Sequence, residues 1–110
     1  MQVEGTYQDK ALIINVDGRL DTTTASDFET QCQELMANDN MNILVDLGSV
    51  EYMSSAGLRS ILSLGKKVKS QGQNLTFCNL QGMVKEVFEV SGFTSIFSVY
   101  DSQEQALEAM

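Results

Sequence analysis

Two adjacent serines, Ser54 and Ser55, stand where a strand-like apolar run gives way to residues at helical spacing, and their hydroxyls are the main candidates for chemistry. The first turn of a helix leaves backbone N–H groups without partners, and the helix dipole adds positive character there. Such a helix start favours an anion, so a phosphate on Ser55 could be held locally. Serine is also a frequent helix N-cap, worth roughly 0.5–2 kcal/mol, and either residue could have only that role. The two roles are compatible because both use the same N–H groups.

Other residue types that carry catalysis are sparse. The chain has no histidine, and its two cysteines, Cys32 and Cys78, lie far apart in apolar patterns, so we expect reduced core thiols and no zinc site. There is no G-x-S-x-G segment and no glycine-rich P-loop. Ser63 and Lys66 match an S-x-x-K pattern, but its companion motifs are missing and the chain is too short for that enzyme class. We therefore expect a non-catalytic protein that needs no cofactor and no metal.

Length and charge narrow the classes of partner. The chain has 110 residues, of which 43% are hydrophobic, so we expect one domain over residues 1–110 with a packed core. The formal net charge of -8 would repel nucleic acid and anionic lipid. No apolar run approaches the roughly 18 residues needed to span a bilayer, and the N-terminus does not resemble a signal peptide. These observations favour a cytoplasmic protein with neither nucleic acid nor membrane as a partner.

The elements that position the two serines follow from hydrophobic spacing. Residues 2–7 and Ala11–Val16 predict two strands joined by a tight turn at Asp9-Lys10, with Asp17-Gly18 bounding the second strand. A helix should follow, because apolar residues recur three and four apart; these are Ala25, Phe28, Cys32, Leu35 and Met36. Thr24–Asp27 resembles a capping box at its start, and residues 38–40 should end it.

Strands and helices alternate through the rest of the chain. We expect strands over residues 41–47, 75–78 and 96–100, and helices over residues 54–70, over residues 83–88 up to Ser91-Gly92, and from a cap at residues 101–104 to Met110. This order predicts an α/β fold with a mixed, mostly parallel sheet of four to five strands and about four helices. Sites in such sheets form where strands end and helices begin, so the segment between Asp46 and Leu58 is the first place to look.

Basic residues gather on one predicted element. Arg59, Lys66, Lys67 and Lys69 are four of only seven, and all lie on or beside the second helix. One interpretation is a solvated helix side, on which the negative end of the helix dipole favours lysines near the C-terminus. The other is that these residues meet an acidic partner surface and speed association.

Several segments follow one another in a specific order and spacing along nearly the whole chain: Gly18–Asp21 followed by Thr22–Ala25, the strand end at Asp46-Leu47, Tyr52–Leu58, Val84–Phe88, and Ser91–Phe93. Together they resemble the STAS domain family, and within it the bacterial anti-sigma factor antagonists. The resemblance implies a STAS fold that works by binding another protein.

The resemblance also implies particular site residues. In this family the phosphorylated residue follows an aspartate in a pattern like Asp-Ser-Ser-Gly-Leu, and matching its Gly-Leu to Gly57-Leu58 puts the acceptor on Ser55. Ser54 takes the aspartate position, which makes it a rival acceptor, while Ala56 replaces the second serine and Arg59 a frequent small residue. Asp21 matches an acidic residue of the partner-contacting surface, and it could also cap the following helix, either as its only role or together with that contact. The implied partner-binding residues are Asp21, Thr22, Met53, Ser54, Ser55, Ala56, Gly57, Leu58 and Arg59.

The function implied by the resemblance is a phosphorylation switch. The unmodified form would bind an anti-sigma factor, often itself a serine kinase of the histidine-kinase-like ATPase fold, and so free a sigma factor. Phosphorylation of Ser55 would end binding, and a metal-dependent serine phosphatase would restore it. STAS domains serve several systems, so the alternative is a constitutive scaffold or accessory subunit of a stress-signalling or transport assembly.

Overall fold

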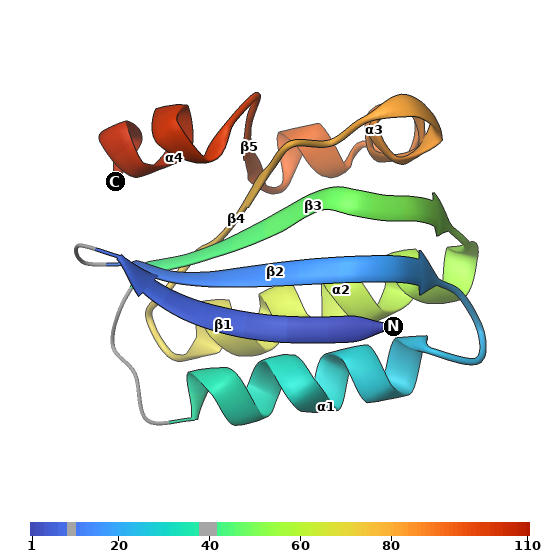
Figure 1. Cartoon of the computed structure of the whole chain (residues 1–110), viewed down its shortest axis with the longest axis horizontal. Coiled ribbons are helices and arrows are strands. Elements are labelled where there is room, and N and C mark those ends of the chain that lie inside the picture. Colours follow the sequence, from blue (N-terminus) through green and yellow to red (C-terminus); the bar gives the residue numbers. More distant parts are fainter. Residues whose placement is uncertain (9–10, 38–41) are drawn as a thin grey trace.

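The computed structural model describes residues 1–8, 11–37 and 42–110 and shows a five-stranded sheet with helices on both faces (Figure 1). The strands lie across the sheet in chain order: β1 (Gln2–Gln8), β2 (Ala11–Leu20), β3 (Asn42–Met53), β4 (Leu75–Cys78) and β5 (Ser98–Tyr100). β1 is antiparallel to β2, and all other neighbours are parallel. The predicted α/β class and the mostly parallel sheet are confirmed.

The helices cover the sheet unequally. α1 (Ala25–Met36) and α2 (Ser55–Ser70) lie side by side against one face, whereas the short α4 (Gln103–Ala109) lies on the other (Figure 1). α3 (Gly82–Val90) and a 3-10 turn (Phe93–Ser95) connect β4 to β5. Because β2 to β5 are parallel, their carboxyl ends share one edge of the sheet, and α2 begins at that edge.

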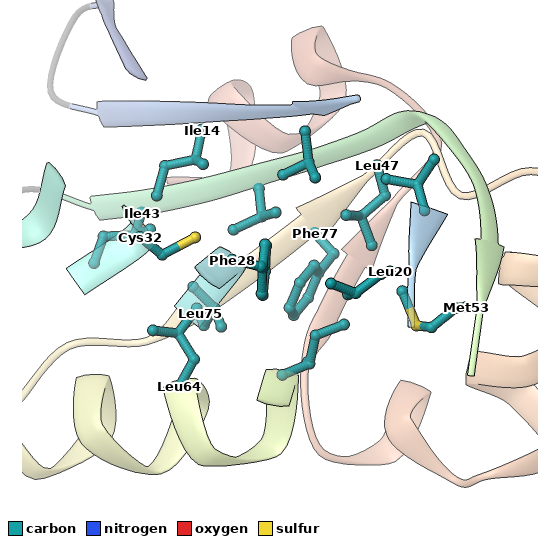
Figure 2. Packing of buried hydrophobic residues seen from close by; sticks show 14 of the residues in the cluster. Ile14, Leu20, Phe28, Cys32, Ile43, Leu47, Met53, Leu64, Leu75 and Phe77 are labelled. Atoms are coloured by element: carbon teal, nitrogen blue, oxygen red, sulfur yellow. The ribbon is translucent and has the colours of Figure 1, made fainter. Parts of the chain in front are cut away.

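The main core lies between the sheet and the pair α1 and α2. Figure 2 shows Ile14, Phe28, Ile43, Leu64 and Phe77 converging there, and each of them is buried. A second, smaller cluster under α4 contains Ile13, Leu44, Cys78 and Ala106. β2, β3 and β4 are therefore covered on both faces, which explains why Ala11–Ile14 of β2 and Ile43–Val45 of β3 are unbroken apolar runs.

Two strands are longer than their patterns predicted. β2 was expected to end at Val16 but continues through Gly18, which adopts a φ of 120°, to Leu20. β3 was expected to end at Leu47 in a short turn but continues to Met53, because its last residues pair with the end of β2 up to Leu20 opposite Met53. The pairing shifts register twice along the way. Glycine and polar residues lie at these shifts. Because the same residue types are typical of turns, the sequence pattern predicted that the strands end there.

Other local predictions had mixed outcomes. The strand over Leu75–Cys78 and the end of α3 at Ser91-Gly92 are confirmed, with Gly92 in the left-handed region. The last strand begins at Ser98 and not at residue 96, since the N–H groups of Ile96 and Phe97 both donate to the carbonyl of Phe93 in the 3-10 turn. The predicted turn at Asp9-Lys10 and the helix stop at residues 38–40 lie outside the described residues.

The predicted capping box at Thr24 was wrong. Thr24 is the N-cap of α1, but its side chain caps no N–H of that helix. Its hydroxyl instead donates to the carbonyl of Arg19 at 2.7 Å and accepts the N–H of Asp21 at 3.0 Å. The threonine therefore ties down the loop between β2 and α1.

Both cysteines are free and buried, as expected of core thiols. Burial raises the pKa of Cys32 and of Cys78 to about 12. The two thiols belong to the two different core clusters, one on each face of the sheet. Within the described residues, no helix has the length and apolar character to cross a membrane.

Candidate functional site

The candidate site lies where β2 and β3 end next to each other. Leu20 is opposite Met53 in the register, and the N–H of Ser54 donates to the carbonyl of Leu20 at 2.9 Å. The residues that follow these two strand ends, Asp21 and Ser54, are therefore held on neighbouring strands at one edge of the sheet. Figure 1 shows the two arrowheads together at this edge, with the start of α2 beside them. The structure thus brings together two parts of the predicted surface that lie more than 30 residues apart in the sequence.

The two serines have different roles at the start of α2. Ser54 is the N-cap: its Oγ accepts the N–H of Gly57 at 3.3 Å, and the residue is half-buried. Ser55 is the first residue of the helix and is exposed, and its hydroxyl has no hydrogen-bond partner in the described part of the chain. Helix capping therefore occupies Ser54 and leaves Ser55 accessible.

Gly57 allows the helix to lie against the end of β2. A Cβ on this residue would be 2.7 Å from the carbonyl oxygen of Leu20 and 2.9 Å from its Cγ, with Met53 Cγ at 3.1 Å. The nearest of these atoms belongs to the backbone, so it cannot move aside as a flexible side-chain end would. Gly57 therefore permits the backbone of α2 to lie close to the end of β2.

Met53 and Gly57 are the two buried residues of the predicted partner-binding set, and they lie beneath its exposed side chains. The Met53 side chain is only 2% exposed and lies beside Leu20 in the core (Figure 2). The family resemblance implied that Met53 contacts a partner, but a side chain buried this deeply is not available for direct contact. The exposed residues of the predicted set are Thr22, Ser55 and Arg59, while Asp21, Ser54, Ala56 and Leu58 are half-buried.

Asp21 organises the loop next to the serines. Its Oδ1 accepts the hydroxyl of Thr23 at 2.7 Å and the N–H of Thr23 at 2.9 Å, and its carbonyl accepts the N–H groups of Thr24 and Ala25. The hydrogen bonds to the carboxylate, led by that of the Thr23 hydroxyl, hold the pKa of Asp21 below its usual range, with Arg19 contributing. Asp21 is not the N-cap of α1, so its carboxylate stabilises the preceding turn and remains charged.

An apolar hollow begins at Leu58, three residues after Ser55 on α2, and no pattern in the sequence predicted it. It has a volume of about 300 Å³ and is lined by Leu58 of α2 and by Glu86, Val87, Val90 and Ser91 of α3. Val90 is 83% exposed, an unusual position for a large apolar side chain. The spacing of Val87 and Val90 could have shown that they share a helix side, but only the fold places that side next to Leu58.

Replacing Ser54 by alanine is expected to lower the free energy of unfolding by about 1 kcal/mol, since the N-cap acceptor for Gly57 is lost. Urea unfolding followed by circular dichroism measures this change. Ser55→Ala is the matched control, because the Ser55 hydroxyl caps nothing and its removal should leave stability nearly unchanged. A larger loss in Ser55→Ala than in Ser54→Ala would contradict the assignment of the cap.

No metal centre is formed by the described residues, where no three histidine, cysteine, aspartate or glutamate side chains gather closely enough to hold an ion. The residues around the start of α2 offer an accessible hydroxyl at Ser55, an ordered carboxylate at Asp21 and an apolar hollow that begins at Leu58. These features are suited to covalent modification and to binding a protein.

Comparison with known proteins places this surface in a family. The family model described as STAS domain matches residues 2–106. A candidate anti-sigma factor antagonist of Bordetella bronchiseptica, BtrV, is 37% identical over 101 residues, which cover 92% of this chain and 87% of that protein. A crystal structure of an anti-sigma factor antagonist from Mycobacterium paratuberculosis matches with a TM-score of 0.88 at 20% identity, covering 98% of this chain and 92% of the other. The Bacillus cell fate determinant SpoIIAA in its phosphorylated form matches with a TM-score of 0.69 at 16% identity, covering 98% and 96%.

Proposed function

Because this chain belongs to the STAS domain family, we propose that it is an anti-sigma factor antagonist that binds an anti-sigma factor through the surface around Ser55. The relatives named for this role span nearly the whole chain, as the Bordetella protein does at 37% identity. The role requires a binding surface and no catalytic group. The partner is an anti-sigma factor that is also a serine kinase of the histidine-kinase-like ATPase fold.

The observation that carries the proposal is the exposed, unpartnered hydroxyl of Ser55, three residues before Leu58, which lines the apolar hollow. A partner that covers Ser55 would also cover Leu58 and the hollow formed with Val87 and Val90. Apolar area of this kind contributes to affinity once it is removed from water. The partner-binding surface then consists of Asp21, Thr22, Ser55, Leu58 and Arg59, with Met53 and Gly57 holding it in shape.

Phosphorylation of Ser55 switches this surface off. A phosphoserine adds about -1.5 to -2 charges at neutral pH. Burying that charge against apolar groups costs several kcal/mol unless a basic partner compensates. Each loss of about 1.4 kcal/mol weakens binding tenfold, so a modest mismatch is enough to release the partner.

The phosphorylated state has ready contacts within this chain. The N–H groups of the first turn of α2 point toward the helix start, and only that of Gly57 is used by Ser54. Arg59 lies four residues after Ser55 and is exposed, so the two side chains share one side of the helix. A metal-dependent serine phosphatase would restore the binding form, while ATP and magnesium belong to the kinase.

Ser54 in place of the family's aspartate does not prevent this switch in our proposal. Its hydroxyl is committed to the N–H of Gly57 and is half-buried, so a kinase meets Ser55 first. The acidic group near the acceptor is instead supplied by Asp21, which follows the neighbouring strand and stays ionised.

A competition experiment tests the function. Each anti-sigma factor kinase of the same organism is loaded with its sigma factor and mixed with the unmodified protein, and complexes are separated by gel filtration. We expect one sigma factor to be displaced and this chain to co-elute with the kinase. If no complex loses its sigma factor and none retains this chain, the proposed function is wrong.

A further inference from the structure

A second hollow lies toward the other end of α2, away from Ser55. It has a volume of about 220 Å³ and is formed between the second half of α2, the start of β4 and the residues that lead into β5. Its apolar lining comes from Leu62, Leu75, Ile96 and Phe97. Ser55 and Lys66 are eleven residues apart on one helix, which corresponds to about 16 Å along the axis. The hollow is therefore separate from the proposed switch.

The hollow is a formed part of the fold. The Phe97 ring lies directly on Gly65, where an added Cβ would come within 2.4 Å of the ring. The same ring is edge-on to Phe77 and to Phe93, with centroids 5.2 and 5.6 Å apart. These contacts fix Phe97, and Ile96 beside it is left 58% exposed at the edge of the hollow. An exposed isoleucine next to a fixed aromatic ring is an apolar surface without a partner in the described chain.

Two cations flank this apolar surface. Lys66 and Lys69 line the hollow and lie three residues apart on α2, so they occupy one side of the helix. Neither forms an ion pair within the described residues, whereas Lys67 between them is paired with Glu29 of α1 at 3.1 Å. In a chain of net charge -8, two uncompensated lysines beside an apolar hollow are an unusual combination.

We propose that this hollow binds a small amphipathic carboxylate, with its apolar body against Leu62, Ile96 and Phe97 and its carboxylate between Lys66 and Lys69. The charge of the rim selects an anion and the lining selects an apolar body, the combination expected of a small-molecule site. A cavity of about 150 Å³ holds benzene, so 220 Å³ suits one aromatic ring or a chain of about eight carbon atoms. The ligand class is a monocarboxylate of that size.

Titration with octanoate, followed by ¹H–¹⁵N NMR of the full chain, tests the proposal. We expect saturable shifts confined to residues around the hollow, and much weaker binding of octanol, which has the same chain and no charge. The double variant Lys66→Gln with Lys69→Gln should weaken octanoate binding about tenfold, because two exposed ion pairs are lost. Ile96→Asp should weaken it further by placing an anion at the edge of the hollow, and its exposed position makes misfolding a small risk.

Lys85→Gln is the matched control, since Lys85 is an exposed lysine of α3 outside the hollow. It should bind octanoate as the wild type does. Equal binding of octanol, equal weakening by Lys85→Gln, shifts spread over the whole surface, or no binding of octanoate would each overturn the proposal. If octanoate fails to bind while the double lysine variant loses affinity for the anti-sigma factor, the hollow is a protein-docking surface instead.

Discussion

Replacing Ser55 by aspartate is expected to weaken binding of the anti-sigma factor about a hundredfold, a loss of about 2.7 kcal/mol. The new carboxylate would have to leave water and enter a surface that includes Leu58, Val87 and Val90. The effect should be smaller than that of a phosphate, which carries more charge. Isothermal titration calorimetry with the purified partner measures the change.

Folding and binding can be separated in this variant. An acidic residue in the first turn of a helix interacts favourably with the helix dipole, so Ser55→Asp should unfold at the same or a slightly higher urea concentration. Ser70→Asp places the same charge at the opposite end of α2 and should leave partner affinity unchanged. If Ser55→Asp binds as tightly as the wild type, the chain acts as a constitutive scaffold and the switch is wrong.

Replacing Gly57 by alanine is expected to lower the free energy of unfolding by about 2 kcal/mol. In a helix this substitution normally stabilises by about 1 kcal/mol, so the expected sign is reversed. The reason is the carbonyl oxygen of Leu20, which lies 2.7 Å from the position of the new Cβ and belongs to the end of β2. Urea unfolding of both proteins measures the difference.

Gly5→Ala provides the matched comparison for this prediction. A Cβ on Gly5 would meet the side-chain ends of Leu35 and Leu12 at 3.0 and 3.3 Å, and such atoms can move. We expect a much smaller loss of stability there. A Gly57→Ala variant that is more stable than the wild type would contradict the close contact between α2 and β2, and with it the positioning of Ser55.

The fold was largely predictable because the spacing of apolar residues marked most strands and helices, and their alternating order implied a mostly parallel sheet. Leu75–Cys78 is a short, fully buried strand, and its boundaries were predicted to the residue. The second half of β3 was not predictable in this way, because Gly48 and Ser49 are typical of turns. The strand continues because Ser49 pairs with Asp17 and Val50 with Gly18 of β2, and no local pattern reveals this pairing.

The site was predictable in position but not in its division of roles. Two adjacent serines at a helix start are equivalent in sequence, and only the backbone geometry shows that Ser54 accepts the N–H of Gly57 while Ser55 faces solvent. Met53 was assigned to the surface by the resemblance to the family, but at the end of β3 its side chain lies beside Leu20 in the core. Val90 was missed because its partners in the hollow come from α2, more than 30 residues away.

The central claim is that Ser55 is the modified residue of a reversible switch. Phosphopeptide mass spectrometry of the protein isolated from its native cells, in exponential and in starved growth, tests it most directly. We predict phosphate on Ser55 with an occupancy that differs between the two conditions, and none on Ser54. Phosphate on Ser54 alone, or no phosphate in either condition, would contradict the account.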